Sequence, residues 1–147
     1  MVSIEEIKKL RNITGVSVTE CKKALEEASG DIDKAKEVLK KLGKDVALKR
    51  SNRETKAGIV DSYIHANKRV GVLIELHCET DFVAKSDDFK ELAHEICLHV
   101  AAFFDEVPIM EQPWIKDSKK TVKDLIDGYI AKFGENIILK QFIRYEV

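Results

Sequence analysis

The sequence predicts an α+β protein, in which a three-helix N-terminal module precedes an antiparallel three-stranded sheet with helices packed on one face. Three short amphipathic patterns, each followed by a glycine, fill the first third of the chain. After Gly58 the apolar period changes from helical to alternating, and it later returns to helical spacing. We therefore divide the 147 residues into a three-helix module at 1–43, a basic linker at 44–57 and an α+β core domain at 58–147.

Capping signals mark the three N-terminal helices. Ser3 with Glu6 and Ser17 with Glu20 have the spacing of a capping box, and Asp31 is the expected N-cap of the third helix. A glycine in the left-handed conformation commonly ends a helix. The glycines expected to end these three helices are Gly15, Gly30 and Gly43.

Alternation predicts the central strand of the sheet. Val72, Ile74 and Leu76 alternate with residues of mixed polarity across residues 70–79. Residues 58–65 predict a partner strand, and the short polar segment ANKR between the two indicates a β-hairpin.

Two further helices follow the hairpin. An apolar stripe at helical spacing runs through residues 89–101, with Ser86 or Asp87 as N-cap. The second helix begins after Thr121 and ends at Gly134. Between these helices, the segment DEVPIMEQPWIKDSKK holds both prolines and the only tryptophan, and it predicts a loop.

The last predicted strand, residues 136–147, has apolar side chains on both faces. Strict alternation places Ile143 and Tyr145 on one face and Ile138 and Phe142 on the other. A sheet covered by helices on one side needs apolar residues on that side only, so the second face is expected to have another cover.

Composition excludes several classes of function. The 25 basic and 26 acidic residues give a net charge of -1, which argues against a dominant nucleic-acid-binding face. No apolar run is long enough to span a bilayer, and the N-terminus MVSIEEIKK does not resemble a signal peptide. Three cysteines, an odd and sparse set, indicate reduced thiols in a cytosol-like compartment.

Candidate nucleophiles and metal ligands do not form a constellation. His77 and Cys78 point to opposite faces of a strand and cannot pair, so Cys78 is interpreted as a small core residue. On a helix His94 and Cys97 are neighbours, but His99 is turned away, and both histidines are interpreted as solvated. With no glycine-rich phosphate loop either, the sequence predicts no catalytic, cofactor or metal site.

The segment HCETDFVAKSDDF places Phe82 directly after an acid at a strand end. A lone aromatic residue there usually folds back onto the core. An exposed aromatic residue on a rigid turn is a typical contact for a partner's pocket. The residues alone leave both interpretations open.

Several segments carry a resemblance to a known family. KKLRNITG followed by ECKKALEEASGDIDKA is similar to its N-terminal signature, and HCETDFVAKSDDF to its second, very specific signature. RVGVLIEL, EQPW and GENIILKQFIRYEV also follow the family's order. By these motifs, which cover nearly the whole chain, the sequence resembles the elongation factor Ts family.

The resemblance implies a guanine-nucleotide exchange factor in translation elongation, a cytoplasmic protein that is not an enzyme. Its partner would be the GDP-bound GTPase elongation factor Tu, with no direct nucleic-acid or membrane partner. It implies that Asp81 and Phe82 enter the partner's GTPase domain near the bound magnesium ion. Thr80 and Val83, which flank the pair, are expected to contact the partner as well.

The resemblance also implies a ubiquitin-associated-like N-terminal module that docks on the same GTPase domain. The positions that match its contact surface are Arg11, Val18 and Thr19. The family usually has a Gly and two Met residues in this turn, where the chain reads TGVSVTE. Val18 and Thr19 offer less flexible apolar surface than paired Met residues.

A larger departure is the absence of a helical segment that familiar members carry between the equivalents of Phe104 and Pro108. The chain also has one copy of the α+β core, so it resembles a minimal, single-core form. Long forms pair two cores within one chain, and a homodimer is therefore expected here. The rival hypotheses are an adaptor that uses only residues 1–43 and a cysteine enzyme around Cys78.

Overall fold

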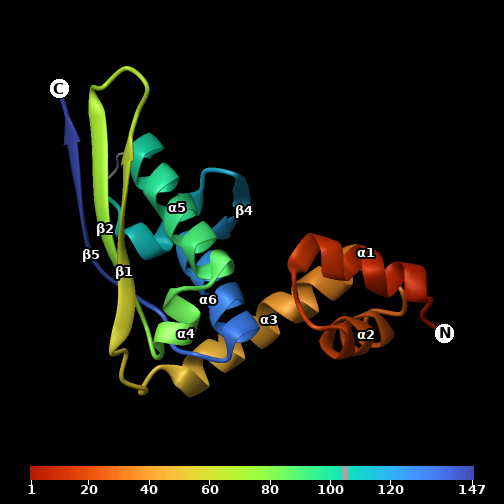
Figure 1. Ribbon diagram of the computed structural model, residues 1–147. Coiled ribbons are helices and arrows are strands. Elements are labelled where there is room, and N and C mark those ends of the chain that lie inside the picture. The colour runs from red at the N-terminus through yellow and green to blue at the C-terminus, as the bar shows by residue number, and fades with distance from the viewer. Residues whose placement is uncertain (104–105) are drawn as a thin grey trace.

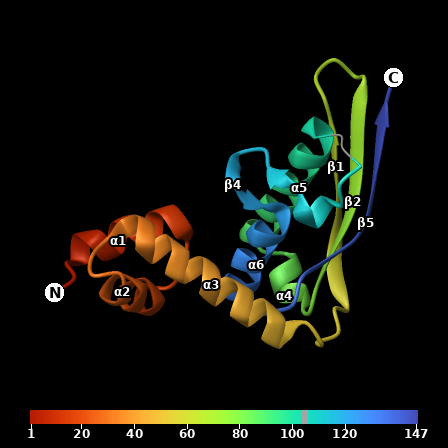
Figure 2. The ribbon, with the colours of Figure 1, turned by 180° about the vertical axis from the view of Figure 1, so that it is seen from behind.

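A computed structural model describes residues 1–103 and 106–147 of the chain. A three-helix module lies to one side of an α+β domain, and the long helix α3 runs from the module to the foot of the sheet (Figures 1 and 2). The elements are α1 (Ile4–Thr14), α2 (Val18–Glu27), α3 (Ile32–Arg50), β1 (Ala57–Ile64), β2 (Val70–Cys78), α4 (Asp81–Ala84), α5 (Asp87–Ala102), the 3-10 helix η1 (Ile109–Glu111), β3 (Pro113–Trp114), β4 (Asp117–Thr121), α6 (Val122–Phe133) and β5 (Ile138–Glu146).

The predicted α+β fold is confirmed. The main sheet is antiparallel with strand order β1-β2-β5, so the first hairpin is extended by the last strand. Helices α4, α5 and α6 lie on one side of this sheet (Figure 1). None of the described elements covers the other side.

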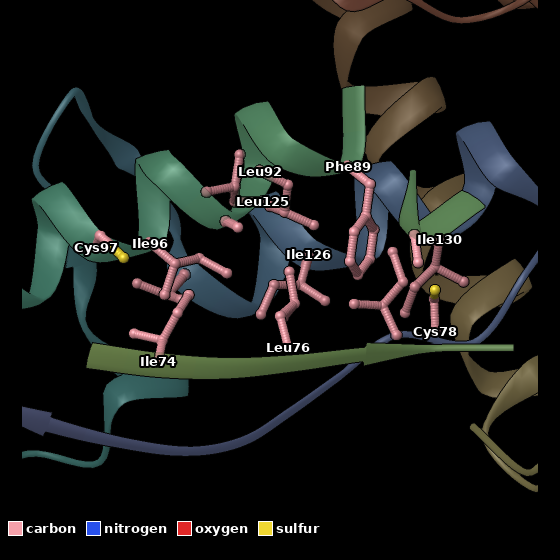
Figure 3. Packing of buried hydrophobic residues seen from close by; sticks show 14 of the residues in the cluster. Ile74, Leu76, Cys78, Phe89, Leu92, Ile96, Cys97, Leu125, Ile126 and Ile130 are labelled. Carbon is pink, nitrogen blue, oxygen red and sulfur yellow. The ribbon is translucent and has the colours of Figure 1, made fainter. Parts of the chain in front are cut away.

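The larger core lies between β2 and the helices α5 and α6. The inward residues of β2 alternate as predicted, and helix α5 is amphipathic, with its apolar stripe facing the strand (Figure 3). Phe89 is fully buried and meets the Phe133 ring edge-on at a centroid distance of 6.3 Å. Figure 3 labels the main contributors: Ile74, Leu76 and Cys78 from β2, Phe89, Leu92, Ile96 and Cys97 from α5, and Leu125, Ile126 and Ile130 from α6.

The N-terminal module has a small core of its own, centred on Leu10, Cys21 and Leu25. Ser3 and Glu6 form the predicted capping box. Ser17 and Asp31 accept hydrogen bonds from the backbone as N-caps of the next two helices. These local signals fix where the helices begin.

Gly43 does not end the third helix, and this prediction was wrong. Helix α3 continues to Arg50, so residues 44–50 of the predicted linker are its second half. Gly43 is buried where α3 crosses α6, and a Cβ there would lie 3.4 Å from the Asp127 carbonyl oxygen. The glycine therefore permits close approach of two helices. Whether 43/44 is a domain boundary stays a prediction.

Ion pairs hold the same crossing. The Lys40 and Lys44 ammonium groups lie 3.3 and 3.6 Å from the two carboxylate oxygens of Asp124, which also completes the capping box of α6 with Thr121. The side chain of Asp124 is only 9% exposed, so water screens these pairs less than it would on an open surface. Lys40 from the expected module and Lys44 from the expected linker thus both bind α6 of the core domain.

Strict alternation along β5 was also wrong, because the ladder shifts register. Glu75 pairs with Gln141 and Leu76 with Leu139, so Lys140 is the extra residue of a bulge. Beyond the bulge Ile143 pairs with the outward residue Leu73. The outward side chains of β5 are therefore Ile138, Gln141, Ile143 and Tyr145.

The segment predicted as a loop contains short regular elements. Residues 109–111 form η1, and β3 and β4 form a small hairpin that precedes α6. The predicted deletion near Phe104 lies partly outside the described residues.

His99 is fully buried, so its interpretation as a solvated histidine was wrong. Its Nδ1 accepts from the Ile115 backbone N–H at 3.2 Å, which places the ring proton on Nε2, and Nε2 donates to Gln112 Oε1 at 2.8 Å. The Gln112 amide in turn donates to the Val107 carbonyl oxygen. This chain of hydrogen bonds fastens residues 107–115 to helix α5.

The His99 network predicts a loss of stability in mild acid. Burial lowers the pKa of His99 below its ordinary value of 6.5, because the site favours the neutral ring. The unfolded chain then binds a proton more readily than the folded chain. The contribution of His99 is complete above about pH 6.5 and falls as the pH decreases toward the folded-state pKa. Urea unfolding at pH 7.5 and 5.5 should show a larger decrease for the wild type than for His99→Leu. An equal decrease in the two proteins would contradict this assignment.

Candidate functional site

The structure shows Phe82 exposed on a short, firmly mounted helix. Phe82 is 86% exposed, so of the two interpretations left open by the sequence the core one is excluded. It lies on α4, a single helical turn between β2 and α5 at the foot of the sheet (Figure 1). Asp81, the first residue of α4, is exposed as well. An apolar ring and a carboxylate therefore project together into solvent.

Two caps define this turn. The Thr80 hydroxyl accepts from the Val83 backbone N–H at 3.3 Å and begins α4. The Ser86 hydroxyl donates to the Val83 carbonyl oxygen at 2.7 Å and accepts from the Phe89 N–H, which begins α5. The sequence indicated a turn here. One helical turn has the same polar residues at its ends, and the two patterns look alike in sequence.

Val83 differs from its neighbours. It is 5% exposed and belongs to the large core, as does Ala84 at 3%. The Val83 side chain faces inward, and contact between Val83 and a partner stays a prediction. This side chain holds α4 against the domain and leaves Phe82 on the outer side.

The residues predicted on the N-terminal module are all at the surface. Arg11, Val18 and Thr19 are exposed around the connection between α1 and α2, with Val18 at 50%. Ile13, which was not predicted as a contact residue, is 51% exposed beside the same connection. An apolar residue just before the glycine that ends α1 was the available signal.

Lys132 lies between the two predicted contact regions. Its ammonium group lies 3.2 Å from the position that a Cβ would occupy at Gly15 in the α1–α2 connection, and 3.2 Å from Asp88 Oδ2 at the start of α5. Asp88 follows α4 closely in the chain. The structure thus brings the α1–α2 connection close to the element next to Phe82, so that one partner surface is able to meet both.

The cysteines have the properties of core residues. Cys78 is buried and donates to the Thr80 carbonyl oxygen, and burial raises its pKa to about 11. Burial likewise raises the pKa of Cys97 to about 12. A thiol needs a lowered pKa to act as a nucleophile near neutral pH. Among the described residues, no group of His, Cys, Asp and Glu side chains is arranged to hold a metal ion.

The uncovered face of the sheet is a second apolar surface. At its centre Leu73 is 48% exposed and pairs with Ile143, which is 43% exposed. A polar group lies at one end, where Glu75 accepts from the Gln141 amide and bonds to the His77 ring. The exposed apolar residues of this outer face are Val60, Ile64, Leu73, Ile138, Ile143 and Tyr145.

None of the helices in residues 1–103 and 106–147 combines the length and apolar character needed to cross a membrane.

Comparison with known proteins shows similarity along the whole chain. A family model described as Elongation factor TS matches residues 4–101 and 79–147. A protein of Thermotoga neapolitana named Elongation factor Ts is 42% identical over 191 residues, covering 99% of this chain and 97% of the relative. One of Thermosipho melanesiensis is 40% identical over 194 residues, covering 100% and 99%. One of Moorella thermoacetica is 38% identical over 194 residues, covering 100% and 96%.

These relatives are longer than the chain. The alignment with the Thermotoga neapolitana protein has 191 positions against the 147 residues here, so the relative has at least 44 positions without a counterpart. Because the alignment covers nearly all of both proteins, the additional positions are internal. The position of the deletion near Phe104 stays a prediction.

Proposed function

The chain belongs to the elongation factor Ts family, and from this premise we propose that it promotes the release of GDP from the GTPase elongation factor Tu during translation elongation. One structural observation carries the proposal. Phe82 is 86% exposed beside Asp81, on a helical turn whose other residues are fixed in the core. An exposed aromatic residue on a rigid turn is a typical anchor for a partner's pocket.

The proposed mechanism is antagonism between factor and nucleotide. A magnesium ion bridges the nucleotide phosphates and the GTPase, so disturbing its surroundings weakens the hold on GDP. We propose that Phe82 inserts between elements of the partner near this ion and that Asp81 accompanies it. Because both ligands bind the same protein with opposing effects, the factor lowers the affinity for GDP as much as GDP lowers the affinity for the factor.

A second contact is proposed through the N-terminal module. Arg11, Val18 and Thr19 would bind the same GTPase domain, and their common exposure supports this role. The position of Lys132 supports simultaneous binding of both regions, since its ammonium group lies next to Gly15 and forms an ion pair with Asp88. The ubiquitin-associated-like character of the module stays a prediction.

We further propose that the chain catalyses no covalent reaction, acts in the cytoplasm and needs no nucleic acid or membrane. The raised pKa values of Cys78 and Cys97 support the first point, because neither thiol is activated. The balanced charge of the chain supports the absence of a nucleic-acid partner.

The proposed function is tested by the release of fluorescent GDP from purified elongation factor Tu. An exchange factor accelerates release when present in substoichiometric amounts. An adaptor that uses only residues 1–43 would bind without this effect, and a cysteine enzyme would not act on the nucleotide complex at all.

We also propose that the outer face of the sheet is the contact between two copies of the chain. Its central residues Leu73 and Ile143 are about half exposed, and none of the described elements covers them. A symmetric pairing of two such faces would bury roughly 1,600 Å² or less. Each copy would keep its Phe82 accessible, because α4 lies on the opposite side of the sheet (Figure 1).

Self-association should be lost when a charge enters the centre of this face. Leu73→Asp would bury a carboxylate without a partner at the contact, which is strongly unfavourable. Sedimentation equilibrium at micromolar concentration should show a dimer for the wild type and a monomer for Leu73→Asp. Leu48→Asp is the matched control, because Leu48 is 76% exposed on α3. A wild-type protein that is strictly monomeric would refute the proposal.

A further inference from the structure

The turn between α6 and β5 is bonded to the segment that carries Phe82. The Glu135 carboxylate accepts three hydrogen bonds from residues 79–80. Its Oε1 accepts from the backbone N–H groups of Glu79 and Thr80, both at 3.1 Å, and its Oε2 accepts from the Thr80 hydroxyl at 2.7 Å. Hydrogen bonds to a carboxylate are stronger than neutral ones. Glu135 therefore holds the last residues before α4 in place.

The Thr80 hydroxyl joins this contact to α4. A hydroxyl has one proton, and here it is donated to Glu135. The lone pairs of the oxygen are then directed to the Val83 N–H, which they cap at 3.3 Å. A four-residue helix is too short to be stable by itself, so its orientation depends on this cap and on the burial of Val83.

The end of α3 is bonded to the same turn. Arg50 Nε donates to the Gly134 carbonyl oxygen at 3.1 Å. The Asn136 side chain donates to the Arg53 carbonyl oxygen at 3.0 Å, and the Asn136 backbone N–H donates to Glu79 Oε2 at 2.6 Å. Residues 134–136 thus bind the end of α3 on one side and residues 79–80, which precede α4, on the other.

We infer that Glu135 is a positioning residue for nucleotide exchange: through Glu79 and Thr80 its carboxylate fixes the orientation in which α4 presents Phe82. This inference rests on the proposed function. Glu135 does not need to touch the partner, since it acts through Thr80. If Glu135 only stabilised the fold by connecting the start of β5 to the end of β2, its removal would lower stability and leave the action of Phe82 unchanged. A positioning role predicts instead a lower rate of GDP release in a folded variant.

The first measurement separates the maximal rate of GDP release from the factor concentration at half-maximal rate. Glu135→Ala should lower the maximal rate at least about tenfold, because three charge-assisted hydrogen bonds are lost. The half-maximal concentration should change less than about threefold, because the exposed contact residues remain. Glu135→Gln should keep most of the rate, since its amide oxygen is able to accept the same two backbone N–H groups. Glu111→Ala, which removes an exposed carboxylate on η1, is the control.

A double-mutant cycle decides whether Glu135 acts through Phe82. In a Phe82→Ala background, Glu135→Ala should cause no further loss of rate. A loss of the same size in both backgrounds would overturn the inference, as would a wild-type rate for Glu135→Ala by itself.

Amide hydrogen exchange tests, in the absence of the partner, whether Glu135 stabilises α4. The N–H groups of Val83 and Ala84 donate to Thr80 and that of Lys85 donates to Asp81. These three amides should exchange faster in Glu135→Ala, while those of α5 keep their protection. Unchanged exchange at these three amides would overturn the inference whatever the rates. If the wild type fails to accelerate GDP release, the proposed function itself is wrong. If the wild type and Glu135→Ala accelerate release equally well, the proposed function stands and only the inference about Glu135 is wrong.

Discussion

Phe82→Ala is expected to abolish most of the acceleration of GDP release and to leave the fold intact. Truncating an aromatic residue at the centre of an interface costs about 2 kcal/mol or more, which is about 30-fold in rate. Phe82 is 86% exposed, so its removal creates no cavity, and the free energy of unfolding should change by less than about 0.5 kcal/mol. Stopped-flow release of fluorescent GDP and urea unfolding measure the two quantities.

Two results for Phe82→Ala would contradict this expectation. A variant that loses several kcal/mol of stability would show that the ring packs on the protein in solution. A variant that exchanges at the wild-type rate would show that the ring makes no functional contact. Asp81→Ala should behave like Phe82→Ala with a smaller loss.

Phe89→Ala should give the reverse pattern, from the same substitution seven residues further along the chain. Phe89 is fully buried against Phe133, and its side chain lies among α5, α6 and β2 (Figure 3). Truncating such a ring costs about 3–5 kcal/mol, a large share of the roughly 5–15 kcal/mol of a typical domain. Urea unfolding should show this loss directly.

Exchange by Phe89→Ala should be reduced only in proportion to the unfolded fraction, because α4 has its own caps and Glu135 contacts. At a low temperature, where more of the variant is folded, a saturating concentration of Phe89→Ala should therefore restore the rate of GDP release. Stability close to that of the wild type would show that the core is assigned incorrectly.

Local signals predicted the ends of most elements, because caps act over three or four residues. Ser3, Thr121 and Gly134 occupy the cap positions that the sequence indicates. The alternation of β2 likewise follows from one buried face and needs no knowledge of the partner strands.

The errors arise where a residue meets something distant in the sequence. Gly43 has the signature of a helix end, yet its lack of a side chain serves the approach of Asp127 in α6. His99 was interpreted as solvated because it is turned away from His94 and Cys97 on the helix, but Gln112 and Ile115 form hydrogen bonds with it in the fold. The bulge at Lys140 has no glycine to mark it and appears only in the pairing with β2.

The candidate site was predicted only in part, because one of its contacts also joins residues that are distant in the sequence. The motif indicated Asp81 and Phe82, and the structure places both at the surface. The motif did not show that Val83 is buried while Asp81 and Phe82 are exposed, because a single helical turn directs neighbouring side chains to different sides. Glu135 was missed entirely, since its contact with Thr80 joins two distant turns.

The most direct test of the account is the rate of GDP release from purified elongation factor Tu with catalytic amounts of the wild-type chain and of Phe82→Ala, each checked for native unfolding behaviour. We expect each wild-type molecule to accelerate release from many GTPase molecules, and the folded Phe82→Ala variant to have lost most of this activity. A folded wild-type chain that leaves the release rate at its spontaneous value, or a Phe82→Ala variant as active as the wild type, would contradict this expectation.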